Sequence, residues 1–142
     1  MDKNIELLNY IHQNAQMGVE TIKQLLKETK DENMKNVLQK HLNEYQKFYD
    51  MADNKLKSNN IEPKELNLLS KAFTDLMINL KTLRDKSPSH MAEMLIQGST
   101  MGIVDMTKKI KEYQGVEKET LDIANGLLQF EQKSVDEYKG FL

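Results

Sequence analysis

The chain lacks cysteine and tryptophan altogether, and it has little proline, glycine or aromatic residue. Its 142 residues include two Pro and six Gly, and 6% are aromatic. Without cysteine there is no disulfide framework, thiolate zinc site, iron–sulfur cluster or cysteine nucleophile. A many-stranded β-sandwich is also excluded, because its short strands need turn-forming residues about every 8–12 positions. The composition therefore favours an all-α fold.

Strong net charge and long apolar runs are missing as well. Twenty Lys and Arg stand against twenty-two Asp and Glu, a formal net charge of −2, so no overall positive field attracts nucleic acid. No stretch approaches about 18 uncharged apolar residues, and the N-terminal segment carries Asp2 and Glu6 in place of a basic region and an apolar run. We expect a cytoplasmic protein with no nucleic-acid partner and no membrane span.

Apolar residues recur at spacings of three and four in the first part of the chain, which is typical of amphipathic helices. One stripe predicts a helix over 4–29, and a second stripe from Met34 to about Lys57 predicts the next, with Asp31 as its N-cap. After a turn, a shorter helix with Leu69, Ala72, Phe73, Leu76, Leu80 and Leu83 on one face ends near Lys86.

Two more helices are predicted in the last third of the chain. Ser87-Pro88 has the form of an N-cap followed by proline at the first helical position, and Gly115 ends the helix that begins there. The last helix runs from about Glu117 to Leu142. Its predicted stripe consists of Leu121, Ala124, Leu128, Glu131, Val135, Tyr138 and Leu142.

These helices predict a single domain over 1–142 that contains two helical hairpins. The hairpins occupy 4–57 and 88–142, and a helical crossover at 58–87 joins them. One long crossover between two hairpins is the connectivity of ferritin-like four-helix bundles.

The two halves also share sequence identities. A shift of 84 residues pairs Gln13, Met17, Gly18, Lys27 and Glu28 with Gln97, Met101, Gly102, Lys111 and Glu112. A shift of 86 pairs Leu42, Gln46, Lys47, Asp50 and Leu56 with Leu128, Gln132, Lys133, Asp136 and Leu142. This pattern indicates the internal duplication of a hairpin.

Three segments carry a resemblance to a known family: Met17-Gly18-Val19-Glu20-Thr21-Ile22, Glu44 to Phe48, and Met77-Ile78-Asn79-Leu80-Lys81. Through them the chain resembles, over nearly its whole length, a bacterial family described only as a ferritin-like domain of unknown function. It is more distantly similar to the spore-coat branch of that superfamily. The resemblance implies a four-helix bundle, and it makes a structural role in the spore coat an alternative to a cytoplasmic one.

A ferritin-like di-metal centre needs an inward carboxylate from each of two helices and a Glu-x-x-His pair from each of the other two. Here the set is incomplete, and a reduced metal site would consist of His41, Glu44, Asp105 and Glu131. We expect instead that His41 and Glu131 meet at similar heights in the core and form a structural hydrogen bond, with Tyr45 as a further partner.

The glycines and methionines are interpreted as packing residues. Gly18 and Gly102 lie in helix interiors, where glycine costs about 1 kcal/mol relative to alanine, so we expect a close approach of two backbones at these positions. Nine Met are present. Five of them are predicted to fill the core: Met17, Met34, Met91, Met101 and Met106.

Two functional hypotheses follow. The first is a non-catalytic bundle without cofactor that acts as a homo-oligomer or with a protein partner, in a structural, spore-coat or stress-related role. The incomplete ligand set supports it, as do four apolar residues beyond the stripes, Leu7, Leu26, Ile96 and Ile103, which predict a broad apolar surface. The alternative is an iron- or manganese-binding or oxidase-type protein with the reduced ligand set. The fold alone does not decide between them.

Overall fold

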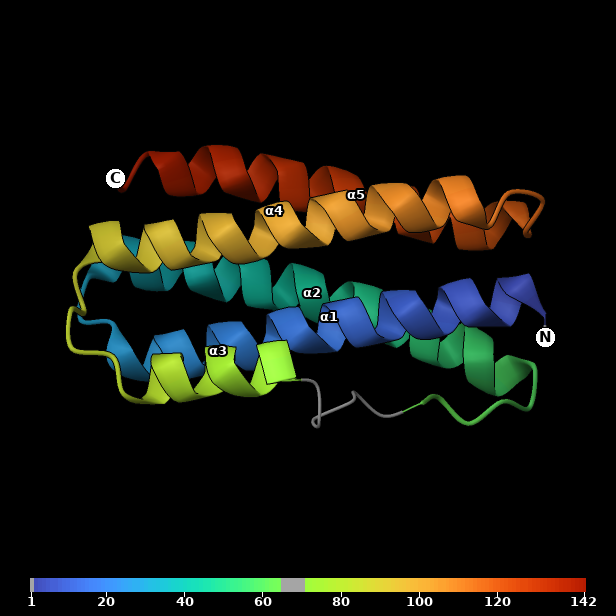
Figure 1. Ribbon diagram of the computed structural model, residues 1–142, viewed down its shortest axis with the longest axis horizontal. Coiled ribbons are helices and arrows are strands. Elements are labelled where there is room, and N and C mark those ends of the chain that lie inside the picture. Colours follow the sequence, from blue (N-terminus) through green and yellow to red (C-terminus); the bar gives the residue numbers. More distant parts are fainter. Residues whose placement is uncertain (1, 65–70) are drawn as a thin grey trace.

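The computed structural model describes residues 2–64 and 71–142, and it confirms an all-α fold (Figure 1). The described helices are α1 (Lys3–Glu28), α2 (Glu32–Ser58), α3 (Lys71–Lys81), α4 (Pro88–Glu112) and α5 (Lys118–Lys139). α1 and α2 form one antiparallel hairpin, α4 and α5 form the other, and the short helix α3 lies between them in the chain and packs against α1.

The end of α2 and the start of α4 lie at opposite ends of the bundle (Figure 1). In Figure 1 the chain leaves the end of α2, passes through α3 and starts α4 at the end of the bundle where α2 began. α2 and α4 therefore run in the same direction, while α2 and α5 run in opposite directions. The hairpins contact each other through α2 and α1 against α5, and α1 contacts α4 less.

Local capping signals explain where the long helices begin. The Asp31 side chain accepts a hydrogen bond from the Met34 backbone N–H at 2.8 Å, and Ser87 accepts one from His90 at 3.2 Å, which confirms both predicted N-caps. Gly115, with φ +86°, follows the end of α4. Side-chain oxygens thus satisfy backbone donors that the helix itself leaves unpaired.

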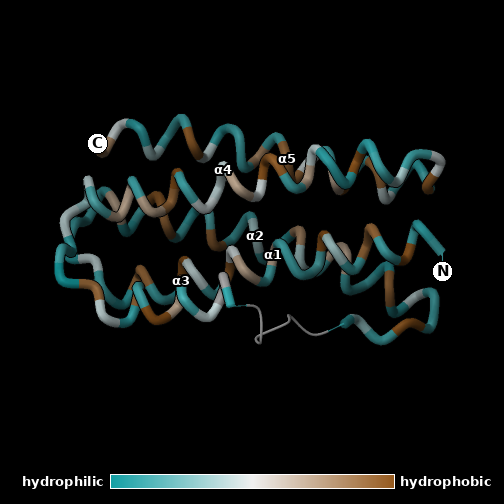
Figure 2. Tube along the Cα trace, in the orientation of Figure 1, coloured by the Kyte–Doolittle hydropathy of each residue, from teal (hydrophilic) through white to brown (hydrophobic). Residues whose placement is uncertain are grey.

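The predicted stripes of the first hairpin form the core. Figure 2 shows apolar and polar residues alternating around each helix, as expected when one face of each packs inward. The buried members in α1 and α2 include Leu8, Ile11, Ala15, Ile22, Leu25, Met34, Leu38, Tyr45, Phe48, Ala52 and Leu56. In the shorter helix Leu80 is buried, Leu69 lies outside the described residues, and so do the side chains of Ala72 and Phe73.

Two details of the predicted helices need correction. α3 ends at Lys81 and not near Lys86, and α5 ends at Lys139, so Leu142 lies beyond the helix and is 61% exposed. In α5 the buried face also turns by about one residue from the predicted stripe. Ile123, Leu127 and Ser134 are buried, whereas Leu121, Leu128 and Val135 are half-buried. The buried and the half-buried residues lie on adjacent parts of the same face of α5, and the apolar face of an amphipathic helix is wide enough to include both.

Within the described parts of the chain, no helix is long and apolar enough to cross a membrane.

Candidate ligand-binding cavity

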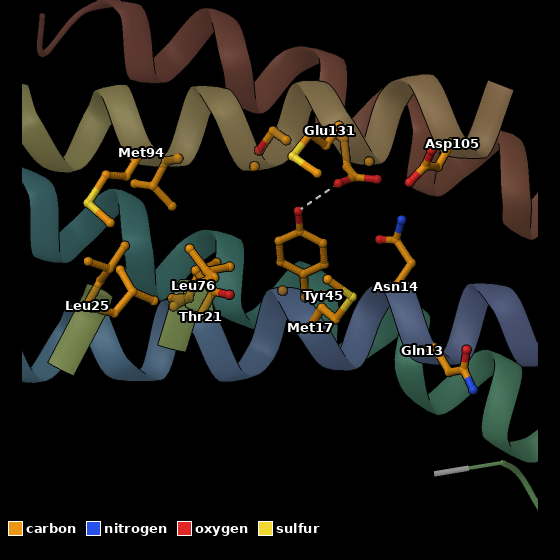
Figure 3. A pocket seen from close by; sticks show the side chains of 18 of the residues that line it. Gln13, Asn14, Met17, Thr21, Leu25, Tyr45, Leu76, Met94, Asp105 and Glu131 are labelled. Carbon is orange, nitrogen blue, oxygen red and sulfur yellow. Dashed lines mark hydrogen bonds between the residues drawn. The ribbon is translucent and has the colours of Figure 1, made fainter. Parts of the chain in front are cut away.

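A cavity of about 380 Å³ lies between the two hairpins (Figure 3). α1 and α4 face each other across it, and side chains of α2, α3 and α5 contribute to its walls. Pockets of this size are typical of small-molecule sites, which lie preferentially between the helices of bundles.

Two interior glycines make room for the side chains at the centre of this region. A Cβ on Gly18 would lie 2.5 Å from the ring of Tyr45, and a Cβ on Gly102 would lie 2.6 Å from Oε2 of Glu131. Each glycine therefore receives a side chain from the other helix of its own hairpin. The sequence predicted a close approach of backbones here; the structure shows backbone against side chain.

A hydrogen bond between Tyr45 and Glu131 links the two hairpins in the core. The Tyr45 hydroxyl donates to Oε2 of Glu131 at 3.0 Å. These residues occupy equivalent positions in the two halves, because a shift of 86 takes 45 to 131. The two hairpins thus place a phenol and a carboxyl group opposite each other, and Tyr45, which the sequence predicted only as a further partner beside His41, forms the bond to Glu131.

The Glu131 carboxyl group is nearly inaccessible to solvent, with 3% of the residue exposed. Burial raises its pKa from the ordinary 4.5 to about 7, nearby Asp105 adds to the rise, and hydrogen bonding with Tyr45 and Asn14 opposes it. In the described part of the chain, Oε1 of Glu131 has no hydrogen-bond partner. A buried carboxylate oxygen without a donor is costly, so this atom is a site that an external donor can satisfy.

The cavity is polar at one end and apolar at the other. Figure 3 shows Glu131, Asp105 and Asn14 gathered at one end, with Leu25 and Met94 at the other. Such a shape suits a ligand with one polar group and an apolar body.

The methionines divide between the core and the cavity. Met34, Met91 and Met106 are fully buried, as predicted. Met17 and Met101, by contrast, line the cavity and are 37% and 62% exposed, so the prediction that they fill the core is wrong. Their positions follow from the separation of α1 and α4, which leaves this face of each helix partly uncovered.

His41 has partners other than the one expected. Its Nδ1 lies 2.5 Å from the Tyr138 hydroxyl, and its Nε2 lies 3.4 Å from Oε1 of Glu137. The predicted bond to Glu131 is not formed among the described residues, since Tyr138 lies two turns further along α5, roughly 10 Å at 1.5 Å per residue. Burial lowers the pKa of His41, and the contact with Glu137 opposes this effect.

The four residues of the reduced metal set are divided between two regions. Asp105 and Glu131 share the polar end of the cavity, whereas His41 is not among the residues that line it and contacts Tyr138 and Glu137 of α5. The Glu44 side chain is 41% exposed and forms an ion pair with Lys47 at 3.2 Å. Across residues 2–64 and 71–142, no group of three or more His, Asp or Glu is arranged to hold a metal ion.

Two polar residues of the cavity, Tyr10 and Asn14, were not singled out from the sequence. They lie at the edge of the α1 stripe, where a polar residue usually faces solvent, and only the separation of α1 from α4 turns this edge into a cavity wall. The predicted duplication is a signal that could have found the region, because Tyr45 and Glu131 align under the shift of 86.

Comparison of the chain with protein-family models, with curated proteins and with solved structures found no match.

Proposed function

We propose that this chain is a non-catalytic bundle of ferritin-like, one-crossover connectivity and that it binds a small molecule in the cavity between its hairpins. The parallel course of α2 and α4, with the end of α2 and the start of α4 at opposite ends of the bundle, supports the connectivity. The observation that carries the binding function is the cavity of about 380 Å³ with a buried carboxyl group at one end.

The groups in the cavity are suited to holding a ligand. Leucine and methionine side chains provide an apolar wall, while a carboxyl, an amide and phenol hydroxyls provide a few directed polar contacts. His41, a candidate metal ligand from the sequence, is not part of the cavity lining, and its ring nitrogens contact Tyr138 and Glu137. Binding without catalysis accounts for this set of groups.

Gly98 offers a direct test of the binding site. It lines the cavity, and a Cβ there would meet nothing within 4 Å, so alanine fits at this position without a clash. We expect n-octanol to raise the melting temperature of the wild type and of the matched control Gly98→Ala, because a ligand that binds only the folded state stabilises it. In Gly98→Phe, whose ring occupies the cavity, the rise is lost. An equal rise in all three proteins, or no rise in the wild type, contradicts the proposal.

A second candidate function, association with another copy or a protein partner, is favoured by exposed apolar residues on α4. Met101 is 62% exposed and Val104 46%. The surface predicted from the sequence is a different one: Leu7 is fully buried, and Leu26, Ile96 and Ile103 are half-buried. Sedimentation equilibrium of the wild type and of the double variant Met101→Ser, Val104→Ser tests this candidate, which requires an oligomer that the substitutions dissociate.

A further inference from the structure

We infer that the ligand of this cavity is a primary amine with an aliphatic body, whose ammonium group binds against Glu131 and Asp105. This inference rests on the proposed function of the cavity as a binding site and specifies the chemical class of the occupant.

The polar end of the cavity offers acceptors that lack donors. Glu131 lines the cavity and is 3% exposed, and within the described residues its Oε1 has no hydrogen-bond partner. An ionised carboxylate only accepts hydrogen bonds. The cavity therefore lacks a donor at this atom, and a ligand can supply it.

The same end of the cavity also lacks a positive charge. Asp105 projects to the same place as Glu131 (Figure 3), and the two carboxyl groups interact unfavourably, since Asp105 helps to raise the pKa of Glu131. The described residues that line the cavity include no Lys, Arg or His. A cationic ligand relieves this repulsion, whereas a carboxylate ligand increases it.

Ammonium is the donor group that fits these acceptors best. It carries three donors and a full charge, so it can serve Glu131, Asp105 and the Asn14 carbonyl oxygen together. A hydroxyl has one donor, and a quaternary ammonium has none. Hydrogen bonds between charged groups are about twice as strong as neutral ones, so the amine gains more here than an alcohol of the same length.

The aliphatic body follows from the other end of the cavity. Leu25, Leu76 and Met94 lie away from the carboxyl groups in Figure 3. From Asn14 to Leu25 the helix advances roughly 16 Å at 1.5 Å per residue, which leaves room for an extended alkyl chain beyond the polar group. Flexible leucine and methionine side chains adapt to such a chain.

Calorimetric titration with three probes of equal chain length, n-octylamine, n-octanol and octanoate, tests the inference at pH 8. We expect n-octylamine to bind at least about tenfold more tightly than n-octanol, because it adds a charge-assisted contact, and octanoate to bind most weakly. In Glu131→Gln the advantage of the amine over the alcohol falls to less than about threefold. Asp105→Asn, at an exposed position, reduces the amine affinity severalfold without loss of stability.

The probes separate the failure of the inference from the failure of the proposed function. If n-octanol binds the wild type and n-octylamine binds no more tightly, the cavity is a binding site and the amine inference is wrong. The inference is also wrong if the amine keeps its advantage in both variants. If none of the three probes binds, the proposed function fails together with the inference.

Discussion

Replacing Glu131 with glutamine tests the burial of this carboxyl group through the pH dependence of stability. The pKa of Glu131 is about 7 in the folded protein against an ordinary 4.5, so between these values the folded state holds a proton that the unfolded state has lost. Stability contributed by this group is therefore complete below pH 4.5 and decreases as the pH rises toward 7. At about 1.4 kcal/mol per pKa unit, the loss amounts to about 3 kcal/mol above pH 7.

Glutamine cannot ionise, yet its side-chain oxygen can still accept the hydrogen bond from Tyr45. We expect Glu131→Gln to differ little from the wild type near pH 4.5 and to be more stable by up to about 3 kcal/mol at pH 8. Urea unfolding from pH 4.5 to pH 8 measures the difference, with Glu62→Gln, at an exposed position, as the control. Parallel pH profiles for the wild type and Glu131→Gln would refute the reasoning.

Three further predictions concern the same core. Tyr45→Phe removes the hydrogen bond that the Tyr45 hydroxyl donates to Oε2 of Glu131, and we expect it to lower the free energy of unfolding by about 1–3 kcal/mol at pH 8. The effect is smaller at pH 5, where Glu131 is protonated, and denaturant unfolding at the two pH values checks both the loss and its pH dependence. Gly18→Ala destabilises the fold because its Cβ meets the Tyr45 ring, whereas Gly98→Ala in open space stabilises it by about 0.5–1 kcal/mol; equal effects on thermal unfolding would contradict the difference in packing. After anaerobic loading with ferrous iron or manganese, we expect mass spectrometry to find no stoichiometric metal, since His41 and Glu131 have separate partners; one ion per chain that is lost in His41→Ala would support the reduced ligand set instead.

Local signals in the sequence predict the helices and their order well. Asp31 and Ser87 cap their helices as expected, because an N-cap involves only a side chain and backbone N–H groups two or three residues away. The core stripe of the first hairpin is equally local, since it depends on the helical period alone. The exceptions are the ends of α3 and α5, which lie at Lys81 and Lys139, and the buried face of α5, which is turned from the predicted stripe.

The polar pairs of the core are harder to predict from sequence. His41 and Glu131 both lie on inward faces, but which residues meet depends on how far α2 slides along α5. An offset of two turns between α2 and α5 is enough to pair His41 with Tyr138 and Tyr45 with Glu131. Helical spacing determines which face of its helix a residue occupies, but it does not determine which residue of the neighbouring helix lies opposite.

The cavity depends on tertiary structure still more. Met17 and Met101 have the spacing of core residues, and they would be core residues if α1 and α4 packed closely. Tyr45 lies against Gly18 and Glu131 lies against Gly102, and the two side chains hydrogen-bond to each other between the hairpins. Such a constraint joins four helices, and no single segment of the sequence reveals it.

The most direct test of ligand binding between the hairpins is an NMR titration of the methionine methyl groups with n-octanol. Met17, Met94 and Met101 line the cavity, whereas Met34 is buried elsewhere in the core and Met51 is on the surface of α2. We predict saturable shifts of the first three signals and unchanged signals from Met34 and Met51. Unsaturable shifts, or shifts as large at Met51 as at Met101, would contradict binding in the cavity.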